Sequence, residues 1–540
     1  MENMEELLKK NDIYEVEIET FSSDGGGVCR LNGRAVFVPR AIPGERWRIR
    51  IVKVNRTAVW ARSEDLLTPS PLRREAECPV YGKCGGCDTM HMSYAAELDF
   101  KLSRVNEALA RIGGLSLRAE EILGAASTEG YRSKGIYNFG PGFQGGFYRA
   151  RSHDIVTTDR CRLQPPEFDR AAAALLAWMR GIGIDGYDES TGKGAIRHLF
   201  LRRSDRDFTA CVVAATPPVD TVVKALRNAC PELTGIVWCV NDRRHNTVLT
   251  DRLHTLWGSD TVTQHLCGAD FRLSPLTFFQ INTAQAERLY ALAGEFAQPQ
   301  GRTVLDLYCG AGSIGLSVAR EAKKIIGSDI VPAAIENAKR NAAANGVENC
   351  EYLCGDAGEI AALLATRGEQ PDVIIVDPPR KGLDAAVIEA ITTMAPERLV
   401  YVSCDPATLA RDLKELTARG YTPLRCKAVD MFPRTKHVET VCLLSKLSET
   451  KHSIDVKLDM DELDVTTSET KATYEEIKAY VLEQTGLQVS SLYIAQVKRD
   501  CGVIERENYN KPKTEDAKQP QCPEEKKKAI EEALKHFEMI

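Results

Sequence analysis

Between residues 302 and 446 the chain repeats one pattern, in which a short apolar segment is followed by a helical stretch. The apolar segments are TVLDLY, KIIGSD, CEYLCGD, DVIIVD and LVYVSC. Alternating strands and helices predict a parallel, doubly wound α/β sheet, because each crossover helix covers one face of the sheet. Two further segments, PLRCKAVDMF and HVETVCLLSK, are expected to add an antiparallel pair of strands.

Polar side chains stand at or near the ends of the five repeated strands. They are Asp306, Asp329, Asp356, Asp377 and Cys404. Ligands of such sheets bind beyond the C-terminal ends of the strands, so we expect these side chains to surround one site. A single acidic residue there could be a helix cap, but a set placed around one edge indicates a binding site.

The segment LDLYCGAGSIG contains Gly310, Gly312 and Gly315 in G-x-G-x-x-G spacing. Glycines let the backbone approach a ligand closely, and the following helix N-terminus favours negative charge. This spacing alone also suits a nicotinamide dinucleotide. However, Asp306 lies close to the loop and fits a cationic or amino-acid-bearing ligand better than a pyrophosphate, while Asp329 could hold both hydroxyls of a ribose. We therefore expect S-adenosylmethionine as the cofactor.

Cys404 lies in a turn between the strand LVYV and a helix that begins near Pro406. A thiol just before a helix N-terminus is expected to be stabilised as a thiolate, which would make it a nucleophile. The alternative is a buried structural thiol. Asp377 is followed by two prolines that fix a rigid turn, either beside a substrate or at the surface. Four other cysteines are expected in the core: Cys309, Cys350, Cys354 and Cys426.

Residues 13–68 read as short strands separated by Gly, Asn-Gly and Pro-Gly turns. In RWRIRI, Arg46, Arg48 and Arg50 alternate with apolar residues, which predicts a strand with an apolar back and a row of guanidinium groups in front. The row is either a solvated edge or the basic face of a small β-barrel that follows a phosphate backbone. The stretch GGGVCRLNGRAVFVPRAIPGE resembles the TRAM domain, an RNA-binding β-barrel, and this resemblance covers about 55 residues.

A cluster of cysteines follows the predicted barrel. Cys78, Cys84 and Cys87 have C-x5-C-x2-C spacing, and Cys161 is a candidate fourth ligand. Thiolates this close together would repel one another unless a metal held them. The spacing does not separate zinc from an iron–sulfur cluster, and three unliganded thiols are the remaining alternative. The N-terminus MENMEELLKKND lacks the apolar core of a signal peptide, so the thiols are expected to be reduced and the protein cytoplasmic.

The net charge of −6 arises entirely after Lys446, so the preceding chain is neutral. If that part binds nucleic acid, it must use local basic patches. Basic residues that could continue such a track are Arg132, Lys134, Arg197, Arg202 and Arg203. No apolar run is long enough to span a bilayer. After Lys446 we expect an acidic linker and then a small module of three helices, whose role the sequence does not reveal.

From about residue 12 to 446 the chain resembles the RNA uracil-5-methyltransferase family, in particular the 23S ribosomal RNA enzymes with a TRAM domain and a [4Fe–4S] cluster. The resemblance rests on the cysteine spacing and on SPLTFFQIN, LDLYCGAGSIG, VDPPRKGL, VSCDPATLARDL and DMFPRTKHVETVCLL. It implies an OB-like TRAM barrel over 1–70, a mixed α/β central domain over 71–270, a Rossmann-like class I S-adenosylmethionine-dependent methyltransferase domain over 271–446, and an additional linker and helical module over 447–540.

The resemblance also implies a role for individual residues. Cys404 matches the nucleophile and Glu439 the general base. The cofactor contacts are Gln280, Tyr308, Asp329, Asp356 and Asp377. The cluster ligands are Cys78, Cys84, Cys87 and Cys161, and the implied RNA contacts are Phe278 and Arg132. Two positions depart from the pattern of the family: Asp329 stands where relatives often have Glu, and Ser313 stands where some have Asn.

The implied reaction transfers a methyl group from S-adenosylmethionine to C5 of a uridine in 23S ribosomal RNA, through a covalent adduct between Cys404 and C6. Transfer RNA is the alternative substrate, although family members that act on it usually lack the barrel and the cluster. Two further alternatives are a non-catalytic RNA-binding ribosome assembly factor and a nicotinamide-dependent oxidoreductase. A monomer without a membrane partner is expected.

Overall fold

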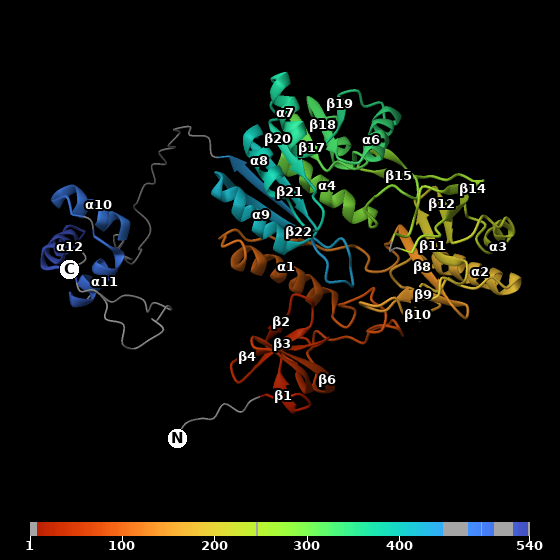
Figure 1. Ribbon diagram of the computed structural model, residues 1–540, viewed down its shortest axis with the longest axis horizontal. Coiled ribbons are helices and arrows are strands. Elements are labelled where there is room, and N and C mark those ends of the chain that lie inside the picture. Colours follow the sequence, from red (N-terminus) through yellow and green to blue (C-terminus); the bar gives the residue numbers. More distant parts are fainter. Residues whose placement is uncertain (1–7, 245–246, 447–473, 488, 502–521, 538–540) are drawn as a thin grey trace, which may run out of the picture. The chain divides into compact units, whose positions relative to one another are not determined.

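The computed structural model describes residues 8–244, 247–446, 474–487, 489–501 and 522–537 (Figure 1). The chain divides into two compact units, Met1–Glu449 and Thr450–Ile540. None of the described helices is long and apolar enough to cross a membrane.

The N-terminal part of the first unit is a six-stranded sheet, drawn in red in Figure 1. Its strand order is β1 (Ile13–Glu17), β5 (Arg46–Val54), β6 (Ala58–Thr68), β4 (Arg34–Val38), β3 (Gly27–Leu31) and β2 (Thr20–Phe21). The predicted alternation in β5 is confirmed, because Ile49 and Ile51 are fully buried in the core of this sheet and the arginines take the other face.

The arginine row of β5 is paired with carboxylates from the two neighbouring strands. Arg48 contacts Glu15 at 3.2 Å and Asp65 at 2.9 Å, and Arg50 contacts Glu64 at 2.6 Å. Arg46 also approaches Glu15, at 3.7 Å. The alternative of a solvated edge strand is wrong, because β5 lies between β1 and β6, which place an acidic residue beside each arginine.

The central part is a seven-stranded sheet in the order β10 (Ile155–Thr157), β9 (Gln144–Tyr148), β8 (Lys134–Gly140), β11 (Ile196–Arg203), β12 (Phe208–Ala214), β13 (Gly235–Val240) and β14 (Leu253–Gly258). Two helices, α2 (Pro166–Ile182) and α3 (Thr221–Ala229), pack on one face through Phe168, Leu175 and Leu226.

Two of the basic residues expected to continue a nucleic-acid track are structural instead. Arg197 and Arg202 are each 4 % exposed. Arg197 donates to the carbonyl oxygens of Asn241 and Arg243, and Arg202 donates to those of Ser274 and Thr277. The expectation for these two arginines is wrong, because β11 is buried on both faces and turns its guanidinium groups onto loop carbonyls.

The catalytic part confirms the predicted α/β sheet. Its order is β19 (Cys350–Cys354), β18 (Lys324–Asp329), β17 (Thr303–Leu307), β20 (Val373–Val376), β21 (Arg398–Ser403), β23 (Glu439–Lys446), β22 (Tyr421–Val429) and β7 (Ile122–Leu123). The five repeated strands are parallel, and β23 runs antiparallel to both of its neighbours. A separate hairpin of β15 (Val262–Leu266) and β16 (Ala269–Leu273) precedes this part.

Helices cover both faces of this sheet. The helices α4 (Thr283–Ala297), α5 (Ser313–Val318) and α6 (Pro332–Ala344) share a core with Val400 and Val402 of β21. The helices α1 (Tyr94–Arg111), α7 (Ala357–Arg367), α8 (Ala385–Met394) and α9 (Pro406–Ala418) share a second core with Leu399 and Tyr401. Successive residues of one strand thus enter opposite cores, which explains why the strands read as continuous apolar runs.

The second unit contains α10 (Tyr474–Thr485), α11 (Ser491–Asp500) and α12 (Glu524–His536) in its described residues. They share a small core that includes Ile477, Ile494 and Ile530. These are the three helices that the sequence predicts, whereas the expected acidic linker lies in 447–473, outside the described residues.

Candidate active site

The carboxyl edge of the catalytic sheet brings Asp377, Cys404 and Glu439 together. Asp377 directly follows β20, Cys404 directly follows β21, and Glu439 is the first residue of β23. In the antiparallel β21–β23 ladder Ser403 lies opposite Thr440, so the next residues along, Cys404 and Glu439, also face each other. The site therefore depends on β23 running against the other strands, which places its first residue at the edge where they end.

The glycine loop after β17 is fixed by two carboxylates from inside the sheet. Asp306 accepts a hydrogen bond from the backbone N–H of Gly315 at 2.9 Å, and Asp329 accepts one from Gly310 at 3.1 Å. Gly312 has φ +80°, and a Cβ there would stand 2.8 Å from the hydroxyl of Tyr352, so this position excludes larger residues. The spacing of the glycines thus reflects a loop that packs tightly on its own sheet.

Asp306 is almost wholly buried, and one of its carboxylate oxygens has no hydrogen-bond partner within the described chain. Burial is the main reason that its pKa is raised to about 7, and Asp377 and Asp329 add to this. A buried acceptor without a donor is costly, so this oxygen indicates a position that a donor group of a ligand or a water would satisfy.

The remaining predicted cofactor contacts, Tyr308, Gln280 and Asp356, have different surroundings. Tyr308 has φ +64° and is half-buried, and Gln280 is buried between β16 and α4. Asp356 forms a capping box at the start of α7, accepting from the N–H of Glu359 at 2.9 Å. The alternative of a helix cap therefore applies to Asp356, without excluding a ligand contact through its second oxygen.

Cys404 is half-buried, and burial raises its pKa to about 11, with further upward contributions from Glu439 and Asp377. The expectation of a thiolate stabilised by the helix N-terminus is therefore wrong. The physical reason is the burial of the thiol, together with the carboxyl groups of Glu439 and Asp377. The Asp405 side chain accepts from the N–H groups of Ala407 and Thr408 at 2.9 Å and 3.2 Å. These N–H groups of α9 therefore already donate to a carboxylate rather than to the thiol.

Glu439 is 4 % exposed, and burial, followed by the charge of Asp377, raises its pKa to about 8. A carboxyl group with a pKa near neutral pH is suited to take up and release a proton. Asp377 also has a pKa raised to about 7 by burial. Two acidic groups and a thiol thus share one poorly hydrated space.

Arg380 supplies the opposing charge, and sequence reasoning did not assign it a role. It lowers the pKa of both Cys404 and Glu439 against the upward effect of burial. It is exposed and follows the two prolines of VDPPRKGL, where the rigid turn directs it back toward the site. A cation immediately after the DPP turn was the signal in the sequence that could have identified it.

The four cysteines predicted to form a cluster line one cavity of about 60 Å³, together with Arg132. Burial is the main cause of the raised pKa of Cys84, Cys87 and Cys161, which reaches about 11 for Cys161, and neighbouring thiols contribute to each. Among the described residues no group of three or more His, Cys, Asp or Glu side chains is arranged to hold a metal ion. Of the four expected core cysteines, Cys309 and Cys426 are buried, whereas Cys350 is half-buried and Cys354 is exposed.

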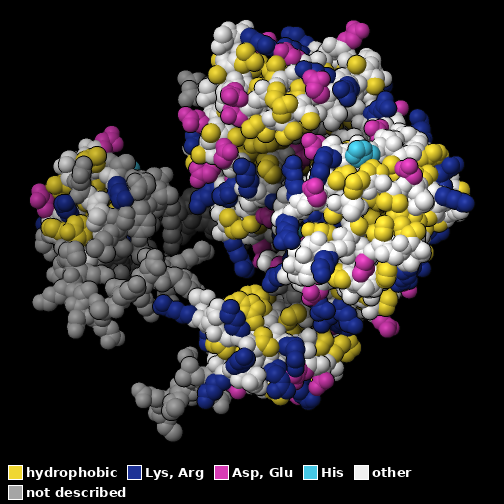
Figure 2. Space-filling model, turned by 45° about the vertical axis from the view of Figure 1, so that its right-hand side comes forward, with side chains coloured by type: hydrophobic (Ala, Val, Ile, Leu, Met, Phe, Trp, Pro, Cys, Tyr) yellow, Lys and Arg dark blue, Asp and Glu magenta, His cyan; other side chains and the backbone are white. Residues whose placement is uncertain are grey.

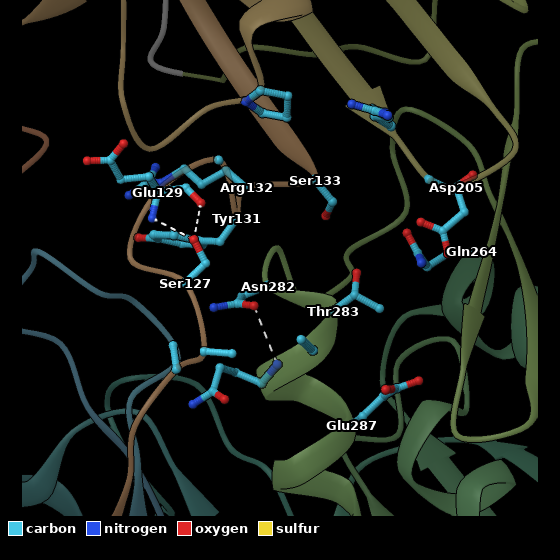
Figure 3. A pocket seen from close by; sticks show the side chains of 18 of the residues that line it. Ser127, Glu129, Tyr131, Arg132, Ser133, Asp205, Gln264, Asn282, Thr283 and Glu287 are labelled. Atoms are coloured by element: carbon cyan, nitrogen blue, oxygen red, sulfur yellow. Dashed lines mark hydrogen bonds between the residues drawn. The ribbon is translucent and has the colours of Figure 1, made fainter.

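Arg132 also lines an open cleft of about 550 Å³ between the central and catalytic parts. In Figure 3, Tyr131 and Arg132 lie on the left, and Asp205 and Gln264 lie on the right. Ser133 lies between them, above Thr283 at the start of α4. Lys and Arg side chains gather around the hollow between these parts on the face shown in Figure 2. Phe278, which precedes α4, is 72 % exposed and so offers an uncovered aromatic ring.

Comparisons with known proteins agree with this arrangement. A sequence profile of the family described as tRNA (Uracil-5-)-methyltransferase matches residues 260–447, and one of the TRAM domain matches residues 8–62. An uncharacterized RNA methyltransferase of Halalkalibacterium halodurans is 40 % identical over 454 residues, which are 82 % of this chain and 99 % of the relative. Another, from Listeria innocua, is 39 % identical over 81 % of this chain and 99 % of its own length.

The solved structures include a similar protein, the Pyrococcus abyssi tRNA (uracil-54, C5)-methyltransferase in complex with S-adenosyl-L-homocysteine. It is 27 % identical, with a TM-score of 0.67 over 80 % of this chain and 99 % of its own. A match over that share of the chain extends well beyond the catalytic sheet, so the likeness concerns the arrangement of several parts of the first unit.

Proposed function

The chain belongs to the family of S-adenosylmethionine-dependent RNA uracil-5-methyltransferases, and we propose that it methylates C5 of a uridine in 23S ribosomal RNA through a covalent adduct with Cys404. The observation that carries the mechanism is the facing pair of Cys404 and Glu439 at the carboxyl edge of the sheet, with Asp377 and Arg380 beside them. A nucleophile beside a base suits a reaction that needs addition and then proton removal.

Uracil C5 is a weak nucleophile, so Cys404 first adds through sulfur to C6 and makes C5 enolate-like. Because Cys404 is a half-buried thiol at neutral pH, its proton must first pass to solvent water, and Arg380 favours the thiolate that results. S-adenosylmethionine, when bound, would supply an electrophilic methyl group for C5 and would leave as S-adenosylhomocysteine. Glu439 then removes the C5 proton, the C5–C6 double bond forms again, and sulfur leaves as the thiolate.

The cofactor contacts proposed are Gln280, Tyr308, Asp329, Asp356 and Asp377. Asp329 accepts from Gly310 of the glycine loop, and Asp356 and Asp377 follow two strands of the same sheet, which supports these three positions. Gln280 and Tyr308 rest on the family resemblance. The structural neighbour from Pyrococcus abyssi contains S-adenosyl-L-homocysteine, the demethylated form of the proposed cofactor. Asp377 would in addition face the polar edge of the uracil ring, since it lies between the loop and Cys404.

We propose that Cys78, Cys84, Cys87 and Cys161 hold a [4Fe–4S] cluster. These residues fit the cluster because all four line one cavity, and neighbouring thiols there raise the pKa of Cys87 and Cys161. The four cysteines would each supply one thiolate to the cluster. Protein purified without oxygen should be brown and contain about four irons per chain, whereas one equivalent of zinc would overturn the assignment.

For the substrate, the barrel and the cysteine cluster support ribosomal RNA. Transfer RNA is the second candidate, because the neighbour from Pyrococcus abyssi is named for a tRNA uridine. Phe278 and Arg132 are the proposed RNA contacts, as an exposed ring for a base removed from its stack and as a cation beside the cleft. A non-catalytic assembly factor would not need the facing pair of Cys404 and Glu439.

The experiment that tests this function uses RNA containing 5-fluorouridine, because fluorine at C5 cannot leave as a proton. The protein is mixed with S-adenosylmethionine and fluorinated 23S ribosomal or transfer RNA, and the products are run on a denaturing gel. A methylated covalent complex with ribosomal RNA alone is expected. A complex with transfer RNA alone would overturn the substrate, and no complex with either RNA would overturn the mechanism.

A further inference from the structure

The loop of residues 430–438 connects β22 to β23 and ends immediately before Glu439. Parts of the chain far away in sequence hold its backbone. Tyr131 donates to the carbonyl of Pro433 at 3.0 Å, and Arg104 donates to that of Lys436 at 2.8 Å. The position of Glu439 therefore depends on residues outside its own sheet.

The first half of the loop is fixed by a buried ionic network on α1. The ammonium group of Lys101 donates to Asp430 at 2.6 Å, to Glu97 at 2.8 Å and to the Phe432 carbonyl at 3.1 Å. Glu97 also accepts from the N–H of Arg434 at 2.7 Å. Lys101, Glu97 and Asp430 are fully buried, so removing any one of them would leave an uncompensated charge and endanger the fold.

The second half, which leads to Glu439, is held by Asp88. The N–H of Asp88 donates to the Arg434 carbonyl at 3.0 Å, and its carboxylate accepts from the N–H of Lys436 at 3.1 Å. The side chain of Lys436 meanwhile pairs with Asp24 of the barrel at 2.9 Å. Asp88 directly follows Cys87, so one residue joins the cysteine loop to the segment that carries the proposed base.

We propose that Asp88 is a positioning residue for Glu439 and that it acts on the proton-removal step. This inference rests on the proposed function. In that step the Glu439 carboxylate takes the proton from C5, the electrons of the C5–H bond form the C5–C6 double bond, and the C6–S bond breaks to return its electron pair to Cys404. A base that is displaced by a fraction of an ångström loses rate steeply, whereas the earlier attack by Cys404 does not use Glu439 in this way.

The test compares Asp88→Ala, Asp88→Asn and Asp99→Ala, each as the full chain with its metal complement. Asp99 is an exposed residue of α1 and provides the control. With natural uridine RNA, Asp88→Ala should turn over at least about tenfold more slowly and accumulate a methylated, denaturant-stable complex. Its rate of complex formation with 5-fluorouridine RNA should stay within about twofold of wild type. Asp88→Asn keeps an acceptor oxygen and should recover most of the turnover.

Several outcomes would overturn the proposal. They are turnover of Asp88→Ala at the wild-type rate, equal losses of fluorouridine trapping and turnover, failure of Asp88→Asn to recover, and a fall in metal content that parallels the loss of activity. The failure of the proposed function itself looks different, because the wild-type protein would then form no complex with 5-fluorouridine RNA.

Discussion

Charged side chains are closely paired on the arginine face of β5, but they are not closely paired at the carboxyl edge of the catalytic sheet. On β5, Arg48 and Arg50 each stand beside carboxylates of adjacent strands, at the surface. At the edge of the sheet, Glu439 and Asp377 are held near each other, and Arg380 is the cation that opposes their effect on Cys404. Charged side chains that are paired across neighbouring strands hold one another in place and do not exchange protons. Buried carboxyl groups without a close cation have a raised pKa and can take up and release protons.

The strongest test of this contrast removes the thiol at the edge. Cys404→Ala should lower methyl transfer by more than about 10⁴-fold, because no other group can form the C6 adduct. It should also abolish the covalent complex with 5-fluorouridine RNA, measured on a denaturing gel. The exposed Cys354 provides a matched control, and Cys354→Ala should behave as wild type. Retention of the complex in Cys404→Ala would show that the nucleophile lies elsewhere.

The second test removes the base. Glu439→Gln should lower turnover by about 10²- to 10⁴-fold and leave a methylated complex with natural uridine RNA, because C5 keeps its proton. Single-turnover kinetics would separate the preserved methyl transfer from the slow release. If no complex accumulates, another group removes the proton.

The same substitution has a pH-dependent effect on stability. Glu439 has an ordinary pKa of 4.5 and a folded pKa raised to about 8, so the folded state holds this proton more tightly. Its stabilising contribution is complete below about 4.5 and is lost as the pH rises through about 8. Glu439→Gln should therefore raise the melting temperature at pH 9 and change it little at pH 5. Equal shifts at both values would contradict the raised pKa.

The third test removes the positive charge of Arg380. Arg380 lowers the pKa of Glu439, so Arg380→Met should move the rising limb of the pH–rate profile, centred near pH 8 in the wild type, to higher pH. The rate at pH 7 should therefore fall, because a smaller share of Glu439 is ionised there. Lys381→Met, at the next position in the same turn, is the control. An unchanged pH profile with a uniformly lower rate would assign Arg380 to RNA binding instead.

The sequence predicted the frame of the site better than its electrostatics. Apolar runs such as Leu399–Val402 determine strands, and parallel strands determine a common edge, so the strand pattern alone was enough to place Asp377 and Cys404 together. The pKa of Cys404 could not be predicted, because it depends on how deeply the fold buries the thiol and on how close Glu439 and Asp377 lie to it. The order of apolar and polar residues identifies the face of a strand on which a side chain lies. The groups that the side chain contacts are determined by tertiary packing.

Long-range contacts also limit what the sequence can predict in other parts of the molecule. Arg202 reads as a surface cation in a basic strand, and only its contact with carbonyls more than seventy residues away shows that it is structural. Asp88 reads as part of the cysteine motif, although its partner Lys436 is 348 positions along the chain. Neither contact leaves a local signal, so the support around Glu439 could be recognised only in the fold.

The smallest expected effect concerns the arginines of β5 and tests the other half of the contrast. Arg48 already has carboxylates of two strands within 3.2 Å, so a phosphate would have to displace them. Arg48→Gln should therefore change RNA affinity by less than about twofold and leave the dependence of log affinity on log salt unchanged. Lys134→Gln, which removes a half-buried cation near Arg132, provides the comparison for a residue outside the barrel. A decrease of about 0.7 in the salt slope for Arg48→Gln would show that the ion pairs of Arg48 break when RNA binds. The contrast between the paired charges of the barrel and the unpaired charges of the catalytic edge would then fail.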